Sequence, residues 1–219
     1  MLTALREHLW VILVTLAYIL GASVYFVAIG DYEFLWYVAV LVVIAGAVAA
    51  TLHRSKFDGV ILWGLSIWGL LHMAGGAVPV GNGVLYGLTL VPLIDAGNEL
   101  VILKYDQVVH FFGFGVATLV VYHLVRPYLA GQVNWPVVFS VVVFAGMGLG
   151  VLNEIVEFIA VLAVPETGVG GYHNTVLDLV FNAFGAIAAV VYLALYREER
   201  VYAHHGMVSR IKSFFHLSE

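Results

Sequence analysis

Apolar side chains fill six long runs of the chain that contain few charged residues. An α-helix rises 1.5 Å per residue, so about 20 residues cross the roughly 30 Å of hydrocarbon in a bilayer. The pattern therefore predicts an all-α polytopic membrane protein, a six-transmembrane-helix bundle. The predicted spans are residues 9–30, 34–52, 60–76, 106–125, 136–161 and 175–196.

The first run follows Arg6 and could be mistaken for a signal peptide. It is longer than the apolar core of such a peptide, about 7–15 residues, and no convincing small-residue cleavage site ends it, so we expect a membrane helix. Residues 1–196 then form one transmembrane domain, followed by a cytoplasmic amphipathic or disordered tail, 197–219. Glycines in the segment 79–105 favour irregular or re-entrant structure over a further helix.

The composition agrees with a chain solvated by lipid. Hydrophobic residues make up 63% of the 219 residues and charged residues 11%, against about 25% charged in soluble domains. The absence of cysteine excludes disulfides, thiolate metal sites and a cysteine nucleophile. With a net charge of −5 and no basic stripe, we expect no nucleic-acid partner.

The positive charges predict the orientation, because lysine and arginine are retained on the cytoplasmic side of a membrane. With the N-terminus inside, eight of the nine lysines and arginines fall on cytoplasmic segments, and only Lys104 falls outside. This distribution predicts that both termini are cytoplasmic. We expect a multi-pass protein of the cell membrane that contacts membrane lipids, and a homodimer is an open alternative.

Polar residues within the predicted spans converge on one depth, near the outer face. His72 lies about 18 Å from the inner start of its span, whereas Asp106 opens the fourth span at the outer surface. Residues three or four apart share a helix face, so each span turns one polar stripe inward. The converging residues are His72, Asp106, His110, Asn153, Glu154, Glu157, Asn174, Asp178 and Asn182.

Four carboxylates cannot all stay ionised in hydrocarbon without a positive partner, since like-charge repulsion is strong at low dielectric. Either protons or a metal ion must share the site. Carboxylates and imidazoles suit a divalent metal such as zinc, manganese or iron(II). The predicted ligands are His72, Asp106, His110, Glu154, Glu157 and Asp178, with Asn153, Asn174 and Asn182 assisting.

Other readings of these residues stay open. The cluster resembles the shell of di-iron helix bundles, but the Glu-x-x-His pairs of those proteins are missing. A hydrogen-bonded network could instead only fasten the helices together. Asp106 could simply cap the helix that it opens, and His72 could be a core histidine. Glycines flank the polar residues, and they would let the helix backbones approach closely there.

The ordered segments resemble those of the YjdF-like inner-membrane proteins of unknown function and, more distantly, of the VanZ-like proteins linked with glycopeptide resistance. Asn174 stands where that family has an aspartate. The resemblance implies a polytopic membrane protein and supplies no reaction. The matching segments are His72-Met-Ala-Gly-Gly76, Tyr105-Asp-Gln-Val-Val-His-Phe111, Glu154-Ile-Val-Glu157-Phe158, and Asn174-Thr-Val-Leu-Asp178 with Asn182 and Gly185.

Two functions from different classes fit this pattern. The first is a metal-dependent hydrolase or transferase that acts on a lipid or lipid-linked substrate from the outer leaflet, with Glu154 or Glu157 as general base. No Gly-x-Ser-x-Gly motif is present, which argues against an acyl-enzyme. The second is a proton- or cation-coupled transporter that uses the same acids.

The orientation can be tested directly because the chain has no cysteine of its own. We expect a cysteine at Val169 to react with a membrane-impermeant maleimide in intact cells, and one at Ser55 to react only after permeabilisation. Labelling is read by a mass shift on a gel. The reverse pattern would place the acidic cluster at the cytoplasmic face.

Overall fold

The computed structural model describes residues 8–95, 101–129, 132–165 and 167–196. Six of its helices are long and apolar enough to span a membrane, which confirms the predicted fold class. Their ends lie within a few residues of the predicted spans. The predicted tail, 197–219, lies outside the described residues. The helices are α2 Leu9–Ile29, α3 Tyr32–Ser55, α4 Gly59–Ala77, α5 Tyr105–Val125, α6 Trp135–Ala163 and α7 Tyr172–Tyr196.

Short polar side chains fix where several helices begin. The side chain of Asp31 accepts a hydrogen bond from the amide of Phe34, 3.0 Å away, at the start of α3. Asp58 caps α4 in the same way, and Asn134 caps α6. Each cap satisfies a backbone amide that has no partner inside its helix. Helix α2 ends at Gly30, whose φ of 70° is a conformation that glycine adopts readily.

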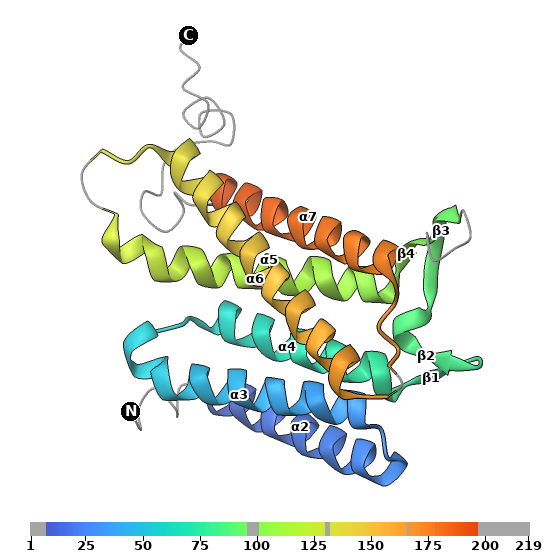
Figure 1. Cartoon of the computed structure of the whole chain (residues 1–219). Coiled ribbons are helices and arrows are strands. Elements are labelled where there is room, and N and C mark those ends of the chain that lie inside the picture. Colours follow the sequence, from blue (N-terminus) through green and yellow to red (C-terminus); the bar gives the residue numbers. More distant parts are fainter. Residues whose placement is uncertain (1–7, 96–100, 130–131, 166, 197–219) are drawn as a thin grey trace.

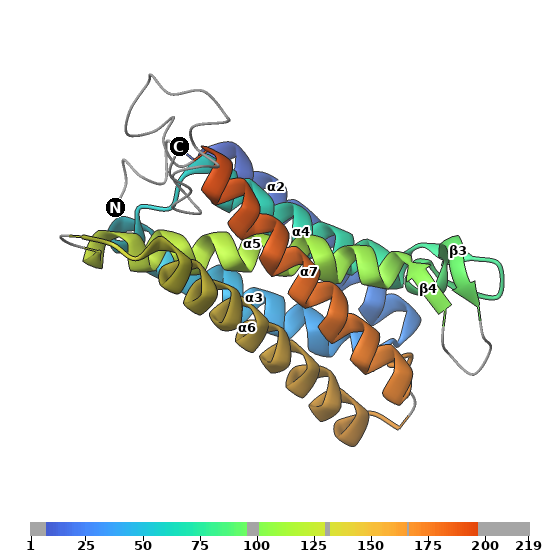
Figure 2. The same cartoon turned by 90° about the horizontal axis from the view of Figure 1, so that it is seen from above.

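The helices form a bundle in which three connections gather at one end (Figure 1). We call this the hairpin end. It holds the turn between α2 and α3, the segment from Val78 to Lys104, and the loop between α6 and α7. Helices α5 and α7 both begin there, so they run in the same direction (Figure 1), and they cross each other (Figure 2).

The segment between α4 and α5 forms two antiparallel hairpins, where we expected irregular or re-entrant structure. Pro79–Val80 (β1) pairs with Gly83–Val84 (β2), and Thr89–Asp95 (β3) pairs with Val101–Lys104 (β4). A single 3₁₀ turn (η1), Leu85–Gly87, joins the hairpins. A second such turn (η2), Arg126–Tyr128, follows α5 at the opposite end of the bundle. In Figure 2, β3 and β4 extend beyond the helices.

Glycines let α5 and α7 pack backbone to backbone. A Cβ atom built on Gly185 would lie 2.1 Å from the carbonyl oxygen of Phe111, and one on Gly115 would lie 3.3 Å from the carbonyl oxygen of Gly185. Small residues allow such approach in membrane helices, where packing rather than water drives association. The crossing fixes the register of the two helices one turn away from His110 and Asn182.

The same device joins the neighbouring helices. A Cβ atom on Gly150 of α6 would meet the amide of Asn182 at 2.7 Å, and one on Gly113 of α5 would meet the indole of Trp68 at 2.1 Å. The expected close packing at glycines is therefore present at these positions. It is absent at Gly148, where nothing lies within 4 Å of a built Cβ atom.

Gly185→Ala should destabilise the protein by about 2 kcal/mol or more, because the added methyl group overlaps a backbone oxygen that cannot move without shifting α5. Gly148→Ala is the matched control, and we expect it to be neutral or slightly stabilising, since alanine favours a helix. Thermal unfolding in detergent measures both. Equal midpoints for the two variants would contradict the close α5–α7 contact.

Candidate functional site

His110 occupies the centre of the polar cluster. It lies on the second turn of α5, is 4% exposed, and its Nδ1 atom is 3.0 Å from Oδ1 of Asn182 on α7. An amide oxygen only accepts hydrogen bonds, so Nδ1 carries the proton and donates it. In the neutral ring the lone pair then belongs to Nε2. Metal-binding histidines are oriented in this way, by a bond from the nitrogen that does not bind the metal.

Carboxylates face the Nε2 side of this ring. Oδ1 of Asp106 lies 3.5 Å from Nε2, and Oε1 of Glu157 lies 3.9 Å from it. These separations exceed ordinary hydrogen bonds. They approach the ~3.3–3.6 Å between two ligand atoms that share a tetrahedral metal at about 2.0–2.2 Å. Oε1 of Glu154 lies 3.7 Å from Nδ1, on the other side of the ring.

Two overlapping groups of residues have the spacing of metal ligands, and they share His110. The ligand atoms of each group all lie within 4.8 Å of one another. Along their helices, Asp106 lies about 1.5 Å from the hairpin end of the bundle, whereas His110, Glu157 and Asp178 lie about 7.5 to 9 Å inside it. Glu154 lies deepest, at about 13.5 Å. The groups are Asp106, His110 and Asp178, and His110, Glu154 and Glu157.

Buried acceptors without partners point to a missing positive charge. Asp178 is fully buried, and its Oδ1 atom has no hydrogen-bond partner among the described residues. Oε1 of Glu154 is also buried and has no hydrogen-bond partner among the described residues. Leaving a carboxylate oxygen unpaired in a membrane interior costs several kcal/mol. These atoms are therefore suited to hold a cation, and the residues present fit a divalent metal.

Asn174 links two of the carboxylates and lies on the first turn of α7. Its Nδ2 atom donates to Oδ2 of Asp178 at 2.7 Å and lies 3.2 Å from Oδ2 of Asp106. Its Oδ1 atom accepts a hydrogen bond of 3.0 Å from Nζ of Lys104. The amide thus holds one oxygen of each acid, and Lys104 brings a positive charge to the edge of the cluster.

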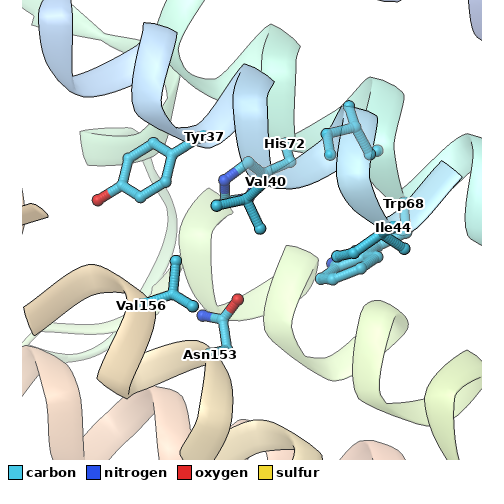
Figure 3. A pocket seen from close by; sticks show the side chains of 9 residues that line it. Tyr37, Val40, Ile44, Trp68, His72, Asn153 and Val156 are labelled. Atoms are coloured by element: carbon cyan, nitrogen blue, oxygen red, sulfur yellow. The ribbon is translucent and has the colours of Figure 1, made fainter. Parts of the chain in front are cut away.

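Asn153 plays a similar part for Glu157, since its Nδ2 atom donates to Oε1 of Glu157 at 2.7 Å. Asn153 also lines a cavity of about 40 Å³ between α3, α4 and α6 (Figure 3). His72 and Tyr37 line the same cavity. Because one water needs about 10–15 Å³, the cavity has room for about three waters next to Asn153.

His72 lies apart from both ligand groups. Its Nδ1 atom forms a hydrogen bond with the hydroxyl of Tyr86 in η1, and its ring packs edge-on against Tyr37 at 5.3 Å. Burial, followed by the charge of Asp106, raises the pKa of the Tyr86 hydroxyl well above its usual range. This hydroxyl keeps its proton, so it can donate to Nδ1 of His72.

Sequence reasoning missed several polar residues of the site. Lys104 carried a signal, as the single cation predicted on the outer side. Gln107 carried none: its side chain accepts a hydrogen bond of 3.1 Å from the amide of Lys104 and so caps α5. Asp106 therefore has no need to act as the cap, and its carboxylate faces His110 and Asn174 instead. Tyr86 also carried no signal, because it comes close to His72 only through the path of the η1 turn between the two hairpins.

A family model described as a predicted membrane protein (DUF2238) matches residues 8–199. The chain belongs to this family. No curated protein and no solved structure matches the chain. The family description and the six spanning helices together make this a multi-pass membrane protein. Neither assigns a reaction, so the function must be argued from the site.

Asn174→Ala should lower the thermal unfolding midpoint, because Asp106 and Asp178 each lose a donor inside the membrane. A buried group left without its partner costs about 1–3 kcal/mol. Thr175→Ala, at the next position along α7, is the control and should have a smaller effect. If the two variants have the same unfolding midpoint, the hydrogen bonds made by Asn174 do not stabilise the protein.

Proposed function

We propose that this protein binds a divalent metal ion at His110 and acts as a membrane-embedded hydrolase or transferase on a lipid or lipid-linked substrate. The observation that carries the proposal is the arrangement around His110. Nδ1 is bound to Asn182, Nε2 faces Asp106 and Glu157, and the fully buried Asp178 keeps an unpartnered oxygen nearby.

The donor set favours zinc, manganese or iron(II), since it offers imidazole nitrogen and carboxylate oxygen without thiolate. We assign the ion to His110 with Asp106 and Glu157, whose oxygens lie 3.5 Å and 3.9 Å from Nε2. Asp178 shares a ligand group with Asp106, and Glu154 shares the other group with Glu157. Among the expected ligands, His72 stands outside this set, because Tyr86 occupies its Nδ1 atom and no ligand group includes it.

When bound, such an ion polarises an ester or phosphoryl oxygen or lowers the pKa of a bound water. The chain supplies the proton transfers and the positioning. Asn153 holds Glu157 in place through a bond of 2.7 Å. Glu154 keeps Oε1 without a partner among the described residues, which makes it the better candidate for general base. The nearby cavity has room for the attacking water.

The depth of the cluster supports headgroup chemistry. The carboxylate residues lie between about 1.5 Å and 13.5 Å inside the hairpin end along their helices, a range that includes the boundary between the polar part of a lipid and its hydrocarbon. Arg54, Lys56 and Arg126 are at the opposite end of the bundle, which favours the outer leaflet as the source of substrate. We also retain the interpretation that the chain is YjdF-like and distantly VanZ-like.

The proposal can be tested with purified protein stripped by a chelator. We expect zinc, manganese or iron(II) to raise the unfolding midpoint by mass action, about 2.7 kcal/mol at a hundredfold excess over the dissociation constant. Gently purified protein should contain about one metal ion per chain by elemental analysis. The metal-loaded protein should also change the lipids of phosphatidylglycerol vesicles, as measured by mass spectrometry.

His110→Ala and the double variant Glu154→Gln with Glu157→Gln should lose the metal-dependent shift. Ser140→Ala, on α6 but remote from the cluster, should retain it. No shift with any metal in the stripped protein would overturn the metal site in favour of a protonated or structural network. Metal binding without any change in the vesicle lipids would favour the alternative, a cation-coupled transporter.

A further inference from the structure

A large apolar groove lies between α2, α3 and α4, in the half of the bundle away from the hairpin end. Its volume is about 330 Å³. Along α3 it extends from Leu41 to Leu52, a length of about 16 Å at the rise of an α-helix. Among the residues that form its walls are Val11, Leu16, Val42, Ala45, Gly46 and Leu62.

The groove offers almost nothing to a polar occupant. Two of its polar side chains, Thr15 and Ser66, are bonded to each other at 2.7 Å. Apolar cavities of about 150 Å³ stay dry and take up hydrocarbon molecules. The groove also lies at hydrocarbon depth within membrane-spanning helices. A hydrocarbon chain is therefore the occupant that fits both the walls and the surroundings.

The groove adjoins the cavity at His72 and Asn153. Leu41 and Ile44 of α3 line both spaces. On the far side of the cavity, Asn153 is bonded to Glu157. Figure 3 shows Ile44 and Val40 on one wall and Asn153 on the opposite wall. The groove and the cavity therefore lie on two sides of Leu41 and Ile44, and the cavity reaches Glu157 through Asn153.

We infer that the groove holds a hydrocarbon chain of the lipid on which the carboxylate cluster acts, with the headgroup end of that lipid directed toward His72 and Asn153. This inference rests on the proposed function and assigns its substrate as a long-chain lipid. A second copy of the protein would cover only the outer rim of the groove. A single hydrocarbon chain is thin enough to reach the floor of the groove. Leu62 on that floor is only 7% exposed.

Photoreactive phosphatidylglycerol tests the inference. The protein is reconstituted in phosphatidylcholine vesicles with a probe that carries a diazirine at the end of one acyl chain, and labelled residues are identified by mass spectrometry. Leu62 and Leu65 should be labelled from the groove. Phe144 on α6 is 70% exposed and serves as the reference for lipid at the outer surface. A second probe, with its diazirine close to the headgroup, should label Tyr37 and Trp68 instead.

Filling the groove provides the decisive comparison. Gly46 lines the groove and has nothing within 4 Å of a built Cβ atom, so Gly46→Phe adds bulk without a clash at Cβ. Gly21 on α2 is equally open but lies outside the groove, which makes Gly21→Phe the matched control. We expect Gly46→Phe to lower the labelling of Leu62 and Leu65 relative to Phe144 at least fivefold, and Gly21→Phe to leave it unchanged.

Ala49→Phe, which also fills the groove, replaces Gly46→Phe if that variant unfolds. Equal labelling ratios in the filled and control variants would overturn the inference, as would labelling of Leu62 by both probes alike. The metal-dependent thermal shift is measured on the same samples. A shift without groove labelling rejects the lipid chain alone, and groove labelling without a shift rejects the metal function alone.

Discussion

Four carboxylates held in a membrane interior are the constraint on which this structure depends. Hydrocarbon offers such groups no hydrogen bonds, so every stabilising partner has to come from the protein itself or from a bound cation. Asn153 and Asn174 each donate to an acid one turn away on their own helix, Glu157 and Asp178. The remaining contacts, from Asn174 to Asp106 and from His110 to Asn182, join different helices, and glycines bring those helices close together at this depth. The close helix packing and the polar cluster therefore require each other.

The hydrogen bonds satisfy only some of the polar atoms in the cluster. Asn182 accepts a hydrogen bond from Nδ1 of His110, and Asn174 donates to one oxygen of Asp106 and to one oxygen of Asp178. Nε2 of His110 then faces the other oxygen of Asp106 at 3.5 Å, whereas Oδ1 of Asp178 and Oε1 of Glu154 have no hydrogen-bond partner among the described residues. A network built only to fasten helices would leave few acceptors unpaired, because each one is costly when buried. The unpaired oxygens of Asp178 and Glu154 are therefore the feature on which the proposed cation site rests.

Much of this arrangement could be predicted from the sequence, because helix geometry is regular. Span length set the depth of each polar residue, and the spacing of Asp106 from His110 placed both on one face. The details at the hairpin end could not be predicted. Lys104 and Tyr86 contact the cluster through turns whose path depends on strand pairing. The groove was also unpredictable, since an apolar side chain facing lipid and one facing a cavity look the same in a sequence.

The bundle divides into a closely packed half and an open half. Buried residues make up 39% of the apolar stretch of both α5 and α7, but only 22% in α6, 17% in α3 and 11% in α2. The closely packed pair, α5 and α7, holds the proposed ligands Asp106, His110 and Asp178, where a displacement of 1 Å would separate them. The loose half borders the apolar groove, where a lipid chain would have to enter and leave. Helix α4 lies between these halves, with Trp68 packed on Gly113 of α5 and Ser66 bonded to Thr15 of α2. Under the proposed function, this division places the rigid ligand site and the lipid-binding groove on different helices.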